Sequence, residues 1–304
     1  MLTFFAIPKA FRGHIGVIQR NAIQSWQRLQ PPCEIILFGD ETGTARVASE
    51  FRVRHAPTVQ RNSYGTPLVD SIFAAAGRLA SHPWLCYVNA DIILMTDFIQ
   101  AVQRVIALSG QGLMICRRWD VTLTEALDFS PGWEREMRTR VVREGRRRPH
   151  TAIDCFAFPR GLWRDIPPFA LGRGMWDNWL IYGARANGFP VIDLSGVVLA
   201  VHQNHDYAHQ VHAIQTEDDV WSTEEAKHNL TLGGGFAHAF SAYDATHVLT
   251  QRGLRRNATP YSLYRALAML SVSWPPLIPL VRFIRFVSKG FTVMWHASLG
   301  RLKR

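Results

Sequence analysis

The chain has 304 residues, of which 47% are hydrophobic, and it carries a formal net charge of +10 at pH 7. These values suit a single domain of about 250 residues with a sizeable core, followed by an appendage. The sequence contains no internal repeat, no low-complexity tract and no recognised nucleic-acid-binding module. We therefore expect no nucleic acid partner in spite of the positive charge.

Four cysteines lack any paired spacing and lie mostly in apolar, strand-like segments, namely Cys33, Cys86, Cys116 and Cys155. Such thiols are expected to be reduced and buried, as in cytoplasmic proteins. The N-terminus enters an apolar strand directly, without the basic start and long apolar stretch of a signal peptide. A cytoplasmic location is the expectation, with peripheral attachment to the inner face of a membrane if the C-terminal segment described below binds lipid.

Short apolar runs and helical spacing alternate along the first hundred residues. Strands are expected at residues 3–7, 34–38, 53–55 and 84–88, and helices at about 15–29, 44–51 and 67–79. Strands that alternate with helices are typical of a parallel, Rossmann-like sheet. The sequence therefore predicts an α/β fold with a mostly parallel central sheet.

The expected strand at residues 84–88 is followed by two polar side chains, Asn89 and Asp91. Ligands of open α/β sheets bind outside the carboxyl ends of the strands, and a carboxylate placed there can hold a divalent cation that binds phosphates. Asp91 is therefore a candidate metal ligand. The alternative is that Asp91 caps a helix beginning near Thr96 or Asp97, because Asp is a favoured capping residue.

The order of these parts resembles the GT-A-fold glycosyltransferases, which are nucleotide-sugar transferases related to family-two enzymes. In these proteins the fourth strand ends in an Asp-x-Asp motif, which binds the diphosphate of the donor through a divalent metal. Here Asn89-Ala90-Asp91 matches the motif at its last position and departs from it at the first. The resemblance covers roughly residues 2–210, and it implies a GT-A fold, a hexosyltransferase-like activity and Mn²⁺ or Mg²⁺ as cofactor.

A second stretch, residues 171–181, is similar to the Gly- and Trp-rich turn that supplies the general base of inverting members of the family. On this resemblance Asp177 takes the proton from the acceptor hydroxyl, and general bases contribute roughly 10²–10⁴-fold. Trp176 and Trp179 are candidates for stacking on the acceptor sugar. The alternatives are that Asp177 is the N-cap of a helix over 178–187 and that Trp179 belongs to the core.

A histidine-rich stretch follows two strand-like runs at residues 191–194 and 197–201. In the GT-A family a late histidine often completes the metal site, and His202 stands in the matching place. Imidazole is a borderline ligand for Mn²⁺ and a poorer one for Mg²⁺. Two alternatives stay open: His202, His205 and His209 have the spacing of a zinc cluster on one helical face, or they are solvated loop histidines.

Other nucleotide contacts are implied by the resemblance. Asp40 stands at a strand end where the family often recognises the base or ribose, and Pro8 follows the first strand. The loop at residues 61–66 contributes Asn62, Tyr64 and Gly65, and a polar loop before a helix N-terminus suits an anion. Its alternative is an ordinary polar turn. No dinucleotide-binding or P-loop glycine motif is present, which argues against dehydrogenases and P-loop enzymes.

The C-terminal segment differs sharply in composition from the rest of the chain. No acidic residue follows Asp244, whereas ten basic ones do, and removing these ten from the total of 34 leaves 24 basic against 24 acidic residues in 1–244. The run 266–281 is uncharged but only 16 residues long, and it contains three prolines. It is too short for a spanning helix, so we expect a basic, apolar helical appendage over 256–304 that lies on an anionic membrane surface. The alternative is docking on its own domain or on a partner chain.

Together these features predict a glycosyltransferase domain over residues 1–255, which moves a sugar from a nucleotide-diphosphate donor to a glycan or lipid-linked acceptor. The proposed metal ligands are Asp91 and His202, and the proposed base is Asp177. One rival is a sugar-phosphate nucleotidyltransferase, which needs a Gly- and Arg-rich loop where Ala10-Phe11-Arg12-Gly13 stands. The other is a non-enzymatic, membrane-associated scaffold. The donor, the acceptor and the stereochemical outcome are not encoded in these motifs.

Overall fold

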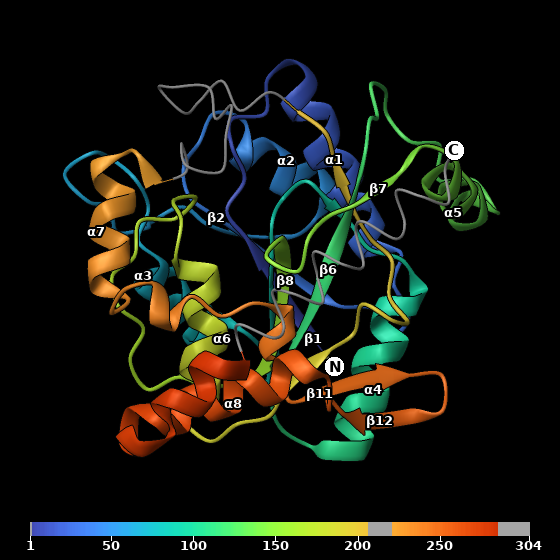
Figure 1. Cartoon of the computed structure of the whole chain (residues 1–304). Coiled ribbons are helices and arrows are strands. Elements are labelled where there is room, and N and C mark those ends of the chain that lie inside the picture. The colour runs from blue at the N-terminus through green and yellow to red at the C-terminus, as the bar shows by residue number, and fades with distance from the viewer. Residues whose placement is uncertain (1, 206–220, 285–304) are drawn as a thin grey trace, which may run out of the picture. The chain divides into compact units, whose positions relative to one another are not determined.

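The computed structural model describes residues 2–205 and 221–284 (Figure 1). The chain divides into two compact units, residues 1–255 and residues 256–304.

Strands and helices alternate through the first unit. The strands are β1 (Leu2–Ala6), β2 (Glu34–Phe38), β3 (Arg54–Ala56), β4 (Trp84–Val88), β5 (Ile92–Ile93), β6 (Leu113–Val121), β7 (Arg146–Arg147), β8 (Ile153–Pro159), β9 (Val191–Asp193), β10 (Ala200–Gln203), β11 (His247–Thr250) and β12 (Gly253–Arg256). The α-helices are α1 (Gly13–Gln27), α2 (Thr44–Phe51), α3 (Val69–Leu79), α4 (Thr96–Ser109), α5 (Trp133–Glu144), α6 (Trp176–Ala186) and α7 (Glu224–Leu232), with 3₁₀ turns η2 (Phe236–His238) and η3 (Ala242–Asp244).

The central sheet has the strand order β12-β11-β9-β6-β8-β4-β1-β2-β3. Strand β1 runs parallel to β2 and β4, β2 to β3, β6 to β9, and β9 to β11. Strand β8 is antiparallel to its two neighbours, β4 and β6. The prediction of a mostly parallel α/β sheet is confirmed, and the expected strands 34–38 and 84–88 and helix 44–51 have the predicted bounds.

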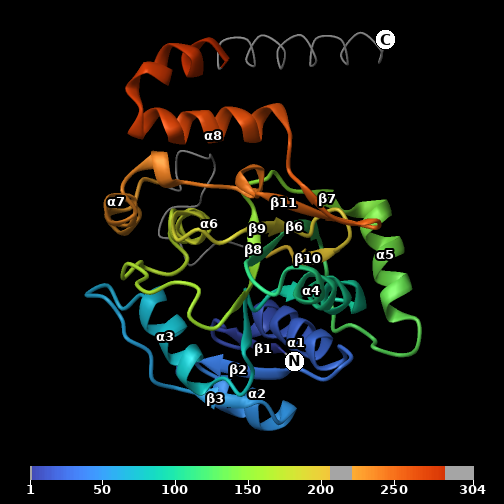
Figure 2. The same ribbon diagram turned by 90° about the horizontal axis from the view of Figure 1, so that it is seen from below.

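Helices cover both faces of the sheet, as Figure 2 shows, with α1 and α4 on one side and α3 and α6 on the other. Buried apolar residues of α1, α2 and α4 pack on one set of alternate strand residues. On the opposite face Phe73 of α3 stacks on Tyr87 and Phe158, with ring centroids 5.6 and 5.5 Å apart. Burial on both faces explains why these strands are continuously apolar in sequence.

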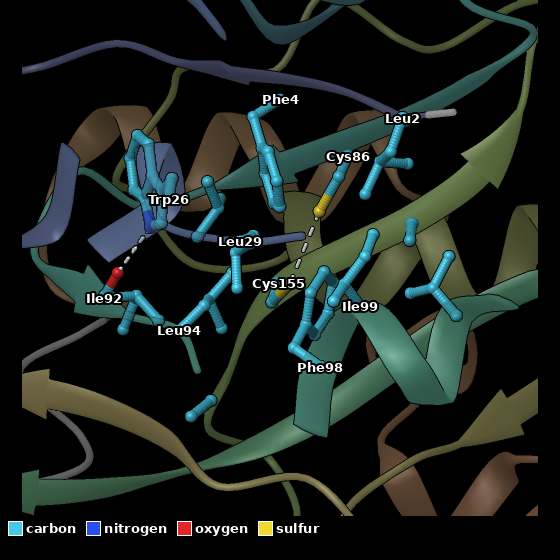
Figure 3. Packing of buried hydrophobic residues seen from close by; sticks show 14 of the residues in the cluster. Leu2, Phe4, Trp26, Leu29, Cys86, Ile92, Leu94, Phe98, Ile99 and Cys155 are labelled. Atoms are coloured by element: carbon cyan, nitrogen blue, oxygen red, sulfur yellow. Dashed lines mark hydrogen bonds between the residues drawn. The ribbon is translucent and has the colours of Figure 1, made fainter. Parts of the chain in front are cut away.

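The core on the α1 side is built around Trp26 (Figure 3). The indole stacks on Phe4, with ring centroids 5.9 Å apart, and its Nε1–H donates to the carbonyl of Ile92 at 2.8 Å. Cys86 and Cys155 lie side by side, with their sulfur atoms 3.5 Å apart, and all four cysteines are free. Because Ile92 belongs to β5, directly after Asp91, helix α1 anchors the segment that follows the carboxyl end of β4.

The described part of the second unit is helical. Helix α8 spans Pro260–Ser273, and η4 (Pro275–Leu277) follows it. Thr259 is the N-cap of α8, because its side chain accepts a hydrogen bond from the backbone N–H of Ser262 at 3.1 Å. Large apolar side chains are exposed along it, namely Tyr261, Leu263, Leu270, Trp274, Ile278, Leu280 and Phe283. Within the residues that are described, no helix combines the length and the hydropathy needed to span a bilayer.

Replacing Trp26 by Phe removes the indole N–H that donates to the Ile92 carbonyl and leaves a gap in the core. We expect the free energy of unfolding of the first unit to fall by about 1–3 kcal/mol. Chemical denaturation of the full chain measures this loss. Trp274→Phe is the matched control, because Trp274 is 62% exposed in the second unit; equal unfolding curves for the two variants would contradict the role of the hydrogen bond.

Candidate metal and catalytic site

Three side chains gather just beyond the carboxyl end of β4. Oδ2 of Asp91 lies 3.0 Å from Nε2 of His205 and 3.7 Å from Nε2 of His202. Each of the three residues offers one ligand atom, and these atoms lie within 4.8 Å of one another. The structure therefore places Asp91 and His202 together, as predicted, and adds His205 to them.

The short strand β10 brings the histidines to Asp91. It pairs antiparallel with β5, where His202 lies opposite Ile92, and parallel with β6. The next residue, Gln203, donates from its side chain to the carbonyls of Asp91 at 3.0 Å and Ile18 at 2.7 Å. The Asp91 backbone is thus fixed by β10 and helix α1 at once, and its carboxylate faces the two imidazoles.

The alternative in which Asp91 caps helix α4 is wrong. The helix begins at Thr96, and the backbone N–H and the hydroxyl of Thr96 both donate to Oε1 of Glu134, at 2.9 and 2.7 Å. Met95 occupies the N-cap position. Helix α5 therefore supplies the acceptor for this N-terminus, and the Asp91 carboxylate remains available.

The Asp91 carboxylate is poised for a cation. Its Oδ1 is buried and has no hydrogen-bond partner among the described residues. Burial raises the pKa of Asp91, but His202, His205 and Lys9 outweigh it and hold the pKa well below its usual range. Lys9, on the loop after β1, was not singled out in the sequence; burial lowers its pKa and Asp91 raises it.

The donor set fits a divalent metal ion. A buried carboxylate oxygen that lacks a partner is costly unless something satisfies it, and one carboxylate with two imidazoles is a common ligand set for first-row metals. Imidazole nitrogen suits Mn²⁺ better than Mg²⁺. The prediction that this chain can hold a divalent cation is therefore matched by Asp91, His202 and His205.

The alternative of a zinc cluster required His202, His205 and His209 to lie on one face of a helix, and neither His202 nor His205 lies in a helix. His202 lies in strand β10, and His205 follows that strand. His209 lies outside the described residues. The two described histidines reach the same point because the strand delivers them to Asp91.

Asn89, at the first position of the motif, is held by its neighbours. Its Oδ1 accepts from the Tyr87 hydroxyl at 2.9 Å, and its Nδ2 donates to Oδ1 of Asp154 at 2.6 Å. Asp154 belongs to the antiparallel strand β8, and it was not predicted as a site residue. Its signal in the sequence is a single acid inside the apolar run of residues 153–158.

Asp177 lies in the first turn of α6, which begins one residue earlier, at Trp176. The N-cap position belongs to Met175, a buried non-glycine residue with φ of +90°. Such a backbone is strained and needs surrounding structure to hold it. Gly233 provides the space, because a Cβ there would collide with the Met175 side chain. Asp177 is therefore not the N-cap, although its Oδ1 accepts from the backbone N–H of Asn178 at 2.9 Å.

Burial raises the pKa of Asp177 to about 7, and the charge of Asp154 adds to the shift, while the Asn178 hydrogen bond opposes it. Tyr87 lies within electrostatic reach of both Asp177 and the candidate metal ligand Asp91. Burial raises the pKa of that tyrosine, and the carboxylates of Asp154, Asp91 and Asp177 raise it further. A carboxyl with a pKa near 7 is suited to general acid or base chemistry at neutral pH.

The two tryptophans beside Asp177 differ in exposure. Trp176 is only 6% exposed, because its ring packs against Tyr87 and Phe156, with centroids 5.2 and 5.9 Å away. Trp179 is half-buried against Phe169, with centroids 5.6 Å apart. Trp179 has the larger free surface, and acceptor stacking remains a prediction for both.

The other residues predicted to contact the nucleotide are Asp40, Asn62, Tyr64, Gly65 and Pro8. Asp40 has a side chain 72% exposed and pairs with Arg61 at 2.8 Å, and the hydrogen bond from Arg61 lowers the pKa of Asp40. Asn62 accepts from the backbone N–H groups of Tyr64 and Thr66 within its own turn. That turn has Gly65 at φ of +79° and Tyr64 69% exposed, and Pro8 is buried after β1. Their contact with a nucleotide remains a prediction.

Comparison with known proteins establishes the fold. No protein-family model and no curated protein sequence matches the chain. Among solved structures, residues 1–349 of TarS from S. aureus, crystallised with UDP-GlcNAc, align with 94% of this chain and 87% of that chain at 11% identity and a TM-score of 0.50. Glucosyl-3-phosphoglycerate synthase from Mycobacterium tuberculosis, with Mg²⁺ and UDP, aligns with 77% of this chain and 80% of that chain at 14% identity and a TM-score of 0.44. The mannosyltransferase PcManGT from Pyrobaculum calidifontis, with GDP-Man and Mn²⁺, aligns with 97% of this chain and 87% of that chain at 11% identity and a TM-score of 0.43.

Of these three, the TarS structure reaches a TM-score of 0.50, and at 11% identity the likeness is one of fold. The predicted Rossmann-like GT-A fold is thereby confirmed. The shared fold places the candidate site of this chain at the carboxyl ends of its parallel strands, where ligands of such sheets bind.

The raised pKa of Asp177 makes stability depend on pH. Between about pH 4, where an unfolded Asp titrates, and pH 7, the folded chain keeps a proton that the unfolded chain has lost. This group therefore lowers stability as the pH rises, with a slope of at most about 1.4 kcal/mol per pH unit. Asp177→Asn removes this titration. The free energy of unfolding of the variant, relative to that of the parent, should therefore increase from pH 4.5 to 7 and then level off.

Chemical denaturation of both chains at pH values from 4.5 to 8 measures this difference. The control is Asp165→Asn, an exposed carboxyl, which should follow the parent at every pH. A constant difference between Asp177→Asn and the parent would show that Asp177 titrates normally.

Proposed function

We propose that the chain is a glycosyltransferase, which moves a sugar from a nucleotide-diphosphate donor to a hydroxyl acceptor. One observation carries the proposal. A carboxylate with two imidazoles that could hold a cation, and a second, half-buried carboxyl with a pKa near 7, both lie within electrostatic reach of Tyr87 in a GT-A fold. The first group suits a diphosphate leaving group, and the second suits proton removal from an acceptor.

The class of donor is supported by the fold. The structure of TarS that shares this fold was crystallised with UDP-GlcNAc, so a nucleotide diphosphate sugar is the donor proposed here. A divalent cation, when bound, would neutralise the charge that develops on the departing diphosphate. Asp91, His202 and His205 would hold that cation. Lys9 lies within electrostatic reach of Asp91, so it would add positive charge beside the same phosphates.

Asp177 is the proposed base. It would take the proton of the acceptor hydroxyl as that oxygen attacks the anomeric carbon, which implies inversion of configuration. The base must be ionised to accept a proton, and with a pKa of about 7 it is ionised in roughly half of the molecules at neutral pH. Trp179, with its half-buried ring two residues away, is the better of the two candidates for contact with the acceptor sugar.

The nucleoside end of the donor would lie toward Asp40 and the turn that contains Asn62, Tyr64 and Gly65. Tyr64 offers a largely exposed ring, and Asp40 offers a carboxylate that Arg61 keeps ionised. Pro8 and Asn89 would border the path between this end and the cation. The contacts of these residues with the donor are part of the proposed function.

The two rival functions have less support. A nucleotidyltransferase needs a Gly- and Arg-rich phosphate loop, whereas Arg12 of this chain donates to the Thr42 hydroxyl at 3.1 Å and Gly13 opens helix α1. The hypothesis of a non-enzymatic scaffold predicts that Asp91 and Asp177 are helix caps, but neither residue occupies the N-cap position of the helix concerned.

We further propose that the second unit binds an anionic lipid surface. Its described helices expose large apolar side chains, and Arg256 and Arg282 are exposed among them. No acidic residue is present anywhere in 256–304. Apolar side chains that enter the interface, together with Arg and Lys beside anionic headgroups, are the features of a monotopic anchor. A lipid-linked acceptor would then be within reach of the protein.

The role of the base predicts the behaviour of Asp177→Asn. Release of nucleoside diphosphate from UDP- or GDP-sugars, with water as acceptor, should slow by roughly 10²–10⁴-fold, because the amide cannot accept the proton. Nucleotide affinity, measured by calorimetry, should stay within about twofold of the parent, since the base contacts the acceptor side. Asp165→Asn serves as the control, and nucleotide release by Asp177→Asn at the parent rate would remove Asp177 from the mechanism.

The lipid proposal predicts binding to vesicles that contain anionic phosphatidylglycerol and little binding to pure phosphatidylcholine. Removing two charges with Arg256→Gln and Arg282→Gln should weaken binding by roughly thirtyfold, at about 1 kcal/mol per residue, and high salt should also weaken it. Arg46→Gln with Arg78→Gln is the matched control, because both are exposed in the first unit. Co-sedimentation measures the binding in each case. Equal binding to both kinds of vesicle would contradict the role of the charges, and no binding to either would favour docking on protein.

A further inference from the structure

His202 has a second ring nitrogen that does not face Asp91. Its Nδ1 lies 3.2 Å from Oδ1 of Asp120, on the neighbouring strand β6. This nitrogen is buried and not aligned for a hydrogen bond to any described residue. Asp120 is therefore within reach of Nδ1.

The sheet itself sets this contact. Strand β10 pairs parallel with β6, and the register places His202 directly beside Asp120. Side chains of directly paired strand residues lie on the same face of a sheet. The two side chains are both well buried, with 4% and 16% exposed, so water has little access to the contact.

Asp120 is in turn held by Arg118, two residues earlier on the same strand. Nε of Arg118 lies 3.0 Å from Oδ1 of Asp120, and Nη1 lies 2.7 Å from Oδ2 of Asp154. The guanidinium is only 13% exposed. Asp154 continues the chain of contacts, because its other oxygen accepts from the Asn89 side chain at 2.6 Å.

On its other side Asp120 meets Arg148, whose Nε lies 3.3 Å from Oδ2. Two arginines therefore fix the orientation of a buried carboxylate that aims one oxygen at His202. Charge-assisted pairs of this kind are stronger than neutral hydrogen bonds. The arrangement is costly to bury unless every charge is paired, and here the carboxylate is paired on both oxygens.

We propose that Asp120 is a positioning residue for the metal site, an inference that rests on the proposed function. Asp120 accepts the Nδ1–H of His202, so that Nε2 of the same ring faces the cation. Arg118 and Arg148 hold Asp120 in place for this. Asn89 stands at the first position of the Asp-x-Asp motif, so the cation would depend on Asp91 and on imidazoles, one of which Asp120 orients.

Asp120 matters because it selects the tautomer of His202. A neutral imidazole carries one proton, and a metal binds the nitrogen that lacks it. A carboxylate beside Nδ1 keeps the proton there and makes Nε2 the free ligand. Partners of this type fix the ring and increase its basicity, and losing one typically costs 10–100-fold in metal affinity.

Affinity of the full chain for Mn²⁺ alone, measured by electron paramagnetic resonance without nucleotide, tests the inference. Asp120→Ala should weaken binding 10–100-fold, whereas Asp120→Asn keeps an acceptor oxygen and should retain most of the affinity. Asp165→Ala, an exposed carboxyl elsewhere, should match the parent. Asp120→Ala with the affinity of the parent would overturn the inference and leave the proposed function standing.

A second readout is made on the parent protein, and a variant serves only to assign the signal. In ¹⁵N-histidine-labelled parent protein without metal, His202, identified by its loss in His202→Gln, should carry its proton on Nδ1. A proton on Nε2 instead would overturn the inference. If the parent binds no Mn²⁺, the metal assignment in the proposed function fails together with this one, an outcome distinct from parent-like binding by Asp120→Ala.

Discussion

The site depends on the pairing of β10 with β5 and β6. This strand has four residues, yet it joins three distant parts of the chain: the segment after β4, the edge of β6 and helix α1. The Gln203 side chain bridges the carbonyls of Asp91 and Ile18, and both are buried groups that need partners. Because the backbone of Asp91 is fixed in this way, a carboxylate and two imidazoles converge without a helix or a dedicated metal loop.

The second constraint is the antiparallel strand β8. In an otherwise mostly parallel sheet it runs between β4 and β6, and it brings Asp154 from the middle of the chain to Asn89. Asp154 raises the pKa of Asp177, and Arg118 lowers it while pairing with Asp154. One antiparallel strand thus connects the cation-binding side of the site to the proposed base through a short set of buried charges.

Sequence patterns predicted the parallel strands well, because continuous apolar runs such as residues 34–38 and 84–88 have few other interpretations. They also indicated Asp91, since a polar side chain that ends an apolar strand is conspicuous, whereas His202 was indicated by the resemblance to the GT-A family. Strand β6 was missed, because Arg117, Arg118 and Asp120 interrupt its apolar pattern. Two of these interruptions, Arg118 and Asp120, are charges that support the site. Their partners Asp154 and His202 lie on other strands, far along the chain, so no local pattern could pair them.

The central claim is that the cation site serves a nucleotide diphosphate. Calorimetric titration of the full chain with UDP and with GDP, in Mn²⁺ and again in EDTA, tests it most directly. The account predicts saturable binding of at least one nucleotide in Mn²⁺, lost in EDTA and strongly weakened in Asp91→Ala. Binding that is equal in Mn²⁺ and EDTA, or no binding of either nucleotide to a folded chain, would contradict it.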